Sequence, residues 1–221
     1  MMVWEEIWLI FISCMSKNGY KKLIMNEKHS LNIVLLGAPG SGKGTQADLI
    51  KRRYRLHHVS TGELFRKEIA KGTELGALAK AIITKGNLCP DEVTLNMLAN
   101  YLERFPNAKG FILDGVPRTI EQAQMLEGIG FDRPIEIDLV ICIKVNKEIV
   151  AERLAKRAEL IGRSDDTPEV IKQRIVNYEN LTFPVSEYYK QKGLLFEIDG
   201  MRSIEEVFRD ICGIIDSHNN H

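Results

Sequence analysis

A glycine-rich segment is the first feature of the sequence whose residue types and spacing could do chemistry. Residues 37–45 read GAPGSGKGT and follow directly after the apolar run Leu31–Leu36. Glycines let consecutive backbone N–H groups turn toward one anion, and the N-terminus of a following helix adds a partial positive charge. Lys43 can then reach phosphate oxygens as a compact cation. This GxxxxGK pattern predicts a phosphate-binding loop that holds a nucleotide, without saying which reaction follows.

The residue after the lysine narrows the class of loop. GTPases and motor-type proteins carry Ser or Thr at that position, and the hydroxyl group holds Mg²⁺ directly. Here the position is Gly44, and Thr45 comes next. This departure argues against a GTPase-like switch protein.

A second group of chemically capable residues follows another apolar run. Residues 111–119 read FILDGVPRT. An aspartate at the carboxyl end of a buried strand points into the crevice where α/β proteins bind ligands. Asp114 would orient Mg²⁺ through its waters, because Mg²⁺ keeps much of its hydration shell. Arg118, after the stiff Pro117, would direct a bidentate guanidinium group at phosphate. On its own the segment could be a strand and a capped turn, but beside the loop we expect it to bind phosphate.

Several arginines complete the set of candidate catalytic groups. Arg66 lies in an expected helix, and Arg153, Arg157, Arg163 and Arg174 cluster late in the chain. Phosphoryl transfer leaves negative charge on the moving group, so its catalysis is mostly positioning plus cations. A single arginine on a helix is usually a solvated side chain. Arg157 and Arg163, however, bracket a short segment with one glycine, which favours a small flap that carries cations.

The elements that must position these residues alternate along the chain. Apolar runs predict five strands, at Leu31–Leu36, His57–Val59, Phe111–Asp114, Asp138–Ile143 and Leu194–Ile198. Amphipathic patterns predict helices at Gly42–Tyr54, Glu92–Arg104, Ile120–Glu127, Lys147–Glu159, Pro168–Gln191 and Ser203–Asp216. This alternation indicates βαβ units and a parallel sheet buried on both faces. Two more expected helices, Gly62–Ala70 and Glu74–Thr84, have no strand between them and predict a small lobe that stands off the sheet.

Composition excludes several other classes of protein. Thirty basic residues balance thirty acidic ones, whereas a general nucleic-acid binder would show a basic excess. The four cysteines show no CxxC spacing, so neither a zinc site nor a disulfide framework is expected, and a reducing cytoplasm is the plain interpretation. His57 and His58 are neighbours on a strand and face opposite ways, so no shared metal site is expected and no role is assigned to them.

The N-terminal segment is treated apart from this domain. Its apolar run in Trp4–Cys14 is too short to span a bilayer, and acidic residues stand where a secretory signal needs positive charge. We expect residues 1–29 to be a leader that is disordered or not native, with the native start at Met25, and residues 30–221 to be the domain.

Several long motifs, in order, resemble those of adenylate kinases. They read GAPGSGKGTQ (37–46), STGELFR (60–66), GNLCPDE (86–92), GFILDGVPRT (110–119) and GRSDD (162–166). The resemblance covers about residues 31–216. It implies an α/β fold with a parallel five-stranded sheet, helices on both faces, a monophosphate-binding lobe at about 60–89 and a lid at about 157–165. The lid is the short form without zinc-binding cysteines, so no structural metal is implied.

The same resemblance implies a role for each matching residue. ATP would be held by Gly40, Ser41, Gly42, Lys43, Gly44, Thr45, Arg157 and Arg202. AMP would be held by Thr61, Arg66, Asn87, Leu88, Cys89, Gly115, Val116, Pro117, Arg118, Gln122, Arg163 and Arg174. The catalytic cations would be Lys43, Arg118, Arg157, Arg163 and Arg174. Mg²⁺ would accompany ATP and meet Asp114 through water. The implied protein is a cytoplasmic monomer with no nucleic-acid or membrane partner. Val116 departs from the family pattern, which has an aromatic residue there.

Two other functions compete with transfer of phosphoryl from ATP to AMP. Uridylate/cytidylate kinases share the loop, Asp114 and the short lid, but tend to carry Ala where Thr61 stands and Asn where Thr119 stands. The amide of Gln122 can pair with the edge of adenine, since it is both donor and acceptor. A non-catalytic nucleotide-binding protein would not need the matching cations. We therefore expect AMP to be the acceptor.

Overall fold

A parallel sheet of five strands forms the centre of the molecule. The computed structural model describes residues 30–128, 134–146, 148–150, 152–154 and 167–219. The strands are β1 (Ile33–Leu36), β2 (His57–Ser60), β3 (Phe111–Asp114), β4 (Leu139–Lys144) and β5 (Leu195–Asp199). They pair in the order β2-β3-β1-β4-β5, and every pair is parallel. The predicted α/β fold is confirmed, with strand boundaries within one or two residues of those expected.

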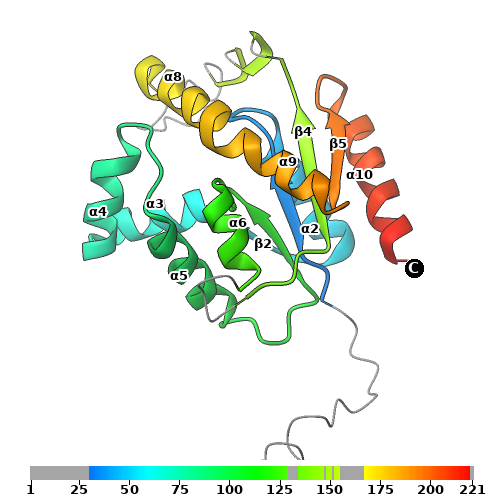
Figure 1. Ribbon diagram of the computed structural model, residues 1–221, viewed down its shortest axis with the longest axis horizontal. Coiled ribbons are helices and arrows are strands. Elements are labelled where there is room, and N and C mark those ends of the chain that lie inside the picture. Colours follow the sequence, from blue (N-terminus) through cyan, green and yellow to red (C-terminus); the bar gives the residue numbers. More distant parts are fainter. Residues whose placement is uncertain (1–29, 129–133, 147, 151, 155–166, 220–221) are drawn as a thin grey trace, which may run out of the picture.

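Helices cover both faces of this sheet, as Figure 1 shows. On one face α2 (Lys43–Tyr54) and α10 (Ile204–Asn219) pack on the side chains of Ile33 and Leu35. On the other face α5 (Asp91–Leu102), α6 (Ile120–Leu126) and α9 (Phe183–Gln191) pack on Val34 and Leu36. Successive residues of a strand point to opposite faces, so alternate residues of β1 belong to different cores. Both faces are apolar, which is why the strands are runs of Val, Ile and Leu rather than an alternating pattern.

A small lobe stands beside the sheet, at the left of Figure 1. It contains α3 (Thr61–Lys71) and α4 (Glu74–Ile83), which begins where the Thr73 hydroxyl accepts the N–H of Gly76 at 3.0 Å. Phe65, Ala79 and Cys89 form a separate buried cluster there. Gly76 permits close packing of the two helices, because a Cβ at this position would lie 2.2 Å from the carbonyl oxygen of Glu68. The lobe therefore has a core of its own.

The long helix predicted over Pro168–Gln191 is interrupted. The structure has α8 (Pro168–Asn177), a π-helical turn η1 (Tyr178–Thr182) and then α9. The N–H of Phe183 bonds to the carbonyl of Tyr178, five residues back, in place of the α-helical partner. The next residue, Pro184, has no N–H to donate. An amphipathic pattern does not reveal one extra residue in a helical turn, so the prediction of one continuous helix was wrong in this detail.

Three other predictions fall wholly or partly outside the described residues. Residues 148–150 and 152–154 are helical, which agrees with part of the predicted helix Lys147–Glu159. The leader at 1–29 and the lid at 157–165 lie outside the described residues. In the part of the chain that the structure describes, no helix has the length and apolar character needed to cross a membrane.

Asn32 ties together the starts of three strands. Its side-chain amide donates to the carbonyl of Glu136 at 2.9 Å, and its side-chain oxygen accepts the N–H of Phe111 at 3.1 Å. Its own N–H donates to the carboxylate of Asp138 at 2.7 Å. Asn32 is 8% exposed, so water cannot replace these partners easily. These bonds align the entries to β1, β3 and β4.

We expect Asn32→Ala to lower the free energy of unfolding by about 1–3 kcal/mol. The change leaves the Glu136 carbonyl without its buried donor, and that is the usual cost of an unsatisfied polar group. Phe111 keeps a second bond, to the carbonyl of Leu31 at 3.1 Å, which limits the loss. Denaturant unfolding measures the effect, and Asn107→Ala, at an exposed asparagine, is the matched control. Equal stabilities of the two variants would contradict this role for Asn32.

Candidate functional site

The glycine-rich segment forms a loop between β1 and α2. Gly40 and Gly42 have left-handed backbone with φ of 81° and 102°, and Gly42 directly precedes the first residue of α2. A Cβ on Gly37 would lie 2.6 Å from the carbonyl oxygen of Ile143, so the loop packs tightly on β4. A Cβ on Gly44 would meet no heavy atom within 4 Å, so the first turn of α2 is open above the loop. The unpaired N–H groups of that turn are suited to bind an anion.

Lys43 lies at the floor of this loop. Its ammonium group donates to the carbonyl oxygens of Gly37 at 2.7 Å and Ala38 at 2.9 Å. Burial lowers the pKa of Lys43 to about 8, the negative charge of Asp114 opposes this shift, and the positive charge of Arg118 adds to it. A nearby anion strongly stabilises the charged form of an ammonium group that is buried in this way.

Asp114 ends β3 next to that lysine. Its side chain is 15% exposed, and one carboxylate oxygen lies 3.4 Å from Nε2 of His58. Burial alone would raise the pKa of Asp114, but the hydrogen bond with His58 and the charge of Lys43 outweigh burial and hold the pKa below its usual value. The carboxylate is therefore ionised at neutral pH. Because β1 and β3 pair with Leu35 opposite Asp114, this carboxylate lies beside the start of the loop.

Arg118 is held in place by the backbone turn that follows β3. Its Nε donates to the carbonyl of Gly115 at 2.8 Å, and the hydroxyl of Thr61 donates to the same carbonyl at 3.0 Å. Gly115 has φ of 86°, and a Cβ there would lie 2.8 Å from the hydroxyl oxygen of Thr61. Burial, and then the positive charge of Arg174, lower the pKa of Arg118. Cations from distant parts of the chain therefore lie close enough to repel one another.

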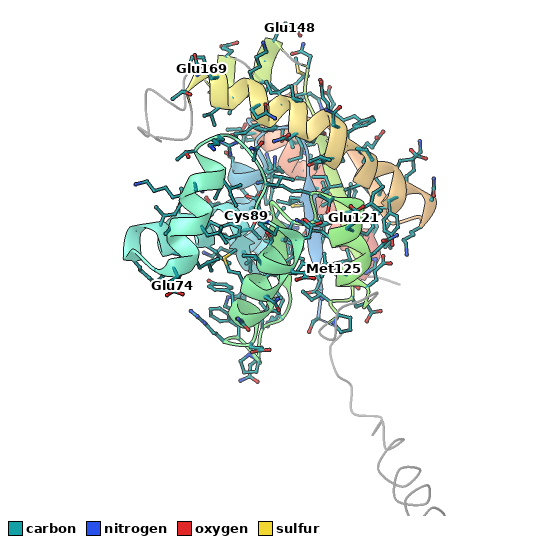
Figure 2. All side chains as sticks on the ribbon, turned by 60° about the vertical axis from the view of Figure 1, so that its left-hand side comes forward. Glu74, Cys89, Glu121, Met125, Glu148 and Glu169 are labelled. Atoms are coloured by element: carbon teal, nitrogen blue, oxygen red, sulfur yellow. The ribbon has the colours of Figure 1, made fainter. Side chains whose placement is uncertain are left out.

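These residues surround a cleft of about 840 Å³, which adjoins a smaller cavity of about 60 Å³ next to the lobe. Five of the site residues predicted from the sequence line both spaces, namely Arg66, Leu88, Gly115, Arg118 and Arg174. In Figure 2, Cys89 lies on the side of the lobe that is turned toward the centre of the molecule, whereas Glu74 lies at its outer side. The smaller cavity therefore opens between the lobe and the sheet, where Cys89 is part of its lining.

The structure brings most of the predicted site residues together. Those that line the larger cleft include Gly40, Ser41, Gly42, Lys43, Gly44, Thr45, Asp114, Pro117 and Arg202. Those that line the smaller cavity include Thr61, Asn87, Leu88, Cys89 and Gln122. Val116 does not join them, because its side chain is fully buried within the core under α5 and α6. Arg157 and Arg163 lie outside the described residues.

Gln122 is bonded at both ends of its amide. The side-chain oxygen accepts the backbone N–H of Arg118 at 2.7 Å, and the side-chain nitrogen donates to Asp91 at 2.7 Å. The second carboxylate oxygen of Asp91 accepts the hydroxyl of Thr119 at 3.0 Å, and that hydroxyl caps α6. Gln122 is 2% exposed, so these bonds are shielded from water.

Sequence reasoning missed the roles of His58 and Asp91, and it named Arg153 only as one of the arginines late in the chain. His58 lines the cleft and contacts Asp114, whereas its neighbour His57 stacks on Phe105 with ring centroids 4.4 Å apart. The expected alternation of the two histidines is correct, but only the pairing of β2 with β3 shows which one faces the site. Arg153 donates to the carbonyls of Ser41 at 3.4 Å and Gly200 at 3.1 Å. Asp91 belongs to the motif GNLCPDE (86–92), but no role was predicted for it.

The arrangement can hold a polyphosphate. Backbone N–H groups at the start of α2, the ammonium of Lys43 and the guanidinium groups of Arg118 and Arg174 converge on one cleft, which also contains the ionised carboxylate of Asp114. Preorganised cations of this kind stabilise the charge that develops during phosphoryl transfer. In the described part of the chain, no group of three or more His, Cys, Asp or Glu side chains could hold a metal ion by itself.

Comparison with known proteins agrees with this geometry. The family model for adenylate kinase matches residues 35–194. An adenylate kinase of Bacteroides fragilis is 45% identical over 187 residues, which cover 85% of this chain and 99% of that protein. An adenylate kinase of Azobacteroides pseudotrichonymphae is 44% identical over 187 residues, with 85% and 98% covered. One of Methylorubrum populi is 44% identical over 192 residues, with 84% and 96% covered. The chain therefore belongs to the adenylate kinase family of phosphotransferases.

Proposed function

We propose that this enzyme transfers the terminal phosphoryl group of ATP to AMP, reversibly, to give two molecules of ADP. The observation that carries the proposal is the convergence of Lys43, Arg118 and Arg174 on a cleft with two connected spaces, one at the phosphate-binding loop and one at the lobe. A coupled assay for ADP tests it, with ATP plus AMP compared with ATP alone. UMP and CMP as acceptors test the uridylate/cytidylate kinase alternative, which the family match does not favour.

ATP would occupy the larger space. Gly40, Ser41, Gly42, Lys43, Gly44 and Thr45 would hold its phosphates through the loop and the N-terminus of α2. Lys43 would bridge the donor and the transferred group, and Arg202, which lines the same cleft, would lie against the adenine. Arg157 and Arg163 would add their charges from the lid.

AMP would occupy the smaller space next to the lobe. Arg66 and Arg118 would hold its phosphate, because both line the passage between the two spaces. The adenine would meet Gln122 and the backbone of Asn87–Cys89, which line the inner part. Thr61 would help indirectly, since it fixes the Gly115 carbonyl that holds Arg118.

Mg²⁺ bound with ATP fits the residues at the end of β3. Asp114 offers a carboxylate that its surroundings keep ionised, it lines the cleft, and a single carboxylate suits an ion that keeps most of its waters. Asp114 would therefore orient the hydrated ion. Bound there, Mg²⁺ would neutralise charge on the transferred phosphoryl group.

We also propose that the lobe at about 60–89 and the lid at about 157–165 close over the substrates, which would exclude water that competes for the phosphoryl group. The separate core of the lobe supports movement as a unit. The enzyme would act as a monomer in the cytoplasm, without zinc and without nucleic-acid or membrane partners. The balance of thirty basic and thirty acidic residues and the free, buried thiols of Cys89, Cys142 and Cys212 support this setting.

Lys43→Met should lower kcat about 100-fold or more, because the lost charge acts mainly on the transition state. The fold should persist, since methionine fills a similar volume and relieves the burial of a charge. Steady-state assays with saturating ATP and AMP measure the effect, and thermal unfolding checks the fold. Lys190→Met, at an exposed lysine of α9, is the control. Near-normal turnover in Lys43→Met would show that this lysine has another role.

The lowered pKa of Lys43 predicts a pH dependence. The ammonium is charged below pH 8 and loses its proton as the pH rises through about 8, and ATP phosphates bind the charged form. We therefore expect kcat/KM for ATP, which reports ionisations of the free enzyme, to fall as the pH rises above about 8. Lys43→Arg should be slower but should lack this decline below pH ~11, because a guanidinium stays charged. The same decline in Lys43→Arg would assign it to another group.

Gln122→Ala should raise the KM for AMP roughly 5- to 100-fold and change the KM for ATP much less. The loss of one paired polar group in a buried site corresponds to about 1–3 kcal/mol. Gln124→Ala, on the same helix but not among the described residues that line the two spaces, is the matched control. Equal effects on both nucleotides would place Gln122 outside the AMP pocket.

A further inference from the structure

The amide of Gln122 can take only one orientation in this structure. Its partner on one side is the N–H of Arg118, which can only donate, at 2.7 Å. Its partner on the other side is the carboxylate of Asp91, which can only accept, at 2.7 Å. The side-chain oxygen must therefore face Arg118 and the nitrogen must face Asp91, because a flipped amide would set donor against donor and acceptor against acceptor.

Asp91 lies behind this glutamine rather than in the pocket. It is the first residue of α5, and among the described residues that line the two spaces neither Asp91 nor Thr119 occurs. Both of its carboxylate oxygens are engaged, one by Gln122 and one by the hydroxyl of Thr119 at 3.0 Å. That hydroxyl in turn accepts the N–H of Gln122 at 3.0 Å. A closed ring of bonds therefore links Asp91, Thr119 and Gln122.

The orientation of the amide determines what it can offer to a base. One N–H and one lone pair of Gln122 remain beyond the bonds to Asp91 and Arg118, and Gln122 lines the smaller cavity. A 6-aminopurine presents an acceptor at N1 and a donor at N6. A 6-oxopurine presents the reverse, a donor at N1 and an acceptor at O6. The two bases therefore require opposite orientations of the same amide.

We propose that Asp91 is a positioning residue that makes the acceptor site specific for 6-aminopurine over 6-oxopurine nucleoside monophosphates. It does so by holding Gln122 in the orientation that matches the 6-amino edge. This inference rests on the proposed placement of the acceptor base against Gln122. Asp91 itself touches no substrate.

The test is Asp91→Asn, with AMP and inosine monophosphate compared as acceptors at saturating ATP. Asparagine keeps the size of aspartate but can accept or donate, so Gln122 can flip with less loss. We expect the ratio of kcat/KM for AMP to that for inosine monophosphate to fall about tenfold, the value of one hydrogen bond to a charged partner. The KM for ATP should not change. Glu92→Gln removes the same charge from the next, exposed residue of α5 and should leave the ratio unchanged.

Two outcomes would overturn the inference. One is an unchanged ratio in Asp91→Asn, whether or not kcat/KM falls equally for both acceptors, and the other is the same change of ratio in Glu92→Gln. If Asp91→Asn does not fold, Asp91→Ser offers a hydroxyl that also accepts or donates, and the same ratio decides. Gln122→Ala distinguishes a failure of the proposed base placement from a failure of the role of Asp91. If it raises the KM for AMP while Asp91→Asn leaves the ratio unchanged, the base placement stands and the role of Asp91 fails; if neither variant has an effect, the base placement itself fails.

Discussion

The burial of several cations close to one another is the constraint around which this site is organised. Burial is the main cause that lowers the pKa of Lys43 and of Arg118, and the positive charge of Arg174 lowers both further. Such groups stay in place only when neighbouring acceptors hold them. Carbonyl oxygens of the glycine-rich loop hold Lys43, and the Gly115 carbonyl holds Arg118. The loop and the turn after β3 are therefore shaped as much by the cations as by the phosphates that they would bind.

The order of the strands explains why these two segments meet. β1 lies between β3 and β4, so the connections that leave β1 and β3 emerge side by side at the carboxyl edge of the sheet. Open α/β sheets bind ligands at this edge, where the strand order reverses direction. Asp114 lies within reach of the loop for this reason, although about seventy residues separate the two segments. Asn32 secures the opposite end of the same three strands.

Local signals in the sequence were enough to predict much of the fold and part of the site. The glycine-rich loop, the apolar strands and the Asp114–Arg118 segment can each be recognised from ten or fewer consecutive residues. This is possible because backbone conformation and burial pattern are local properties. The contact of His58 with Asp114 could not be predicted this way, since it depends on which strands pair. The bond between Gln122 and Asp91 joins residues 31 positions apart, and nothing in either neighbourhood indicates it. The assignment of Val116 to the AMP site comes from the resemblance and stays a prediction, while its side chain is buried in the core.

Polar side chains that lie behind the site are easily overlooked in a sequence. Asp91 and Thr119 lie one layer away from the cavities, and their effect passes through Gln122. Asn32 likewise lies far from the cleft but aligns the strands that carry it. Motifs detect the groups that touch a ligand, whereas these supporting groups are defined by contacts across the fold.

The π-helical turn η1 has a geometrical consequence for the segment that contains it. Arg174 lines the cleft, whereas Val185 packs in the core under the sheet. They are eleven residues apart. In an uninterrupted α-helix each residue turns the direction of the side chain by about 100°, so two residues at this spacing would point to nearly the same side. One additional residue in a wide turn changes the phase between the two halves by about that angle. Figure 1 shows α8 and α9 as one diagonal rod across the front of the molecule. Thanks to this phase shift, a single rod can present one side to the substrates and another to the core.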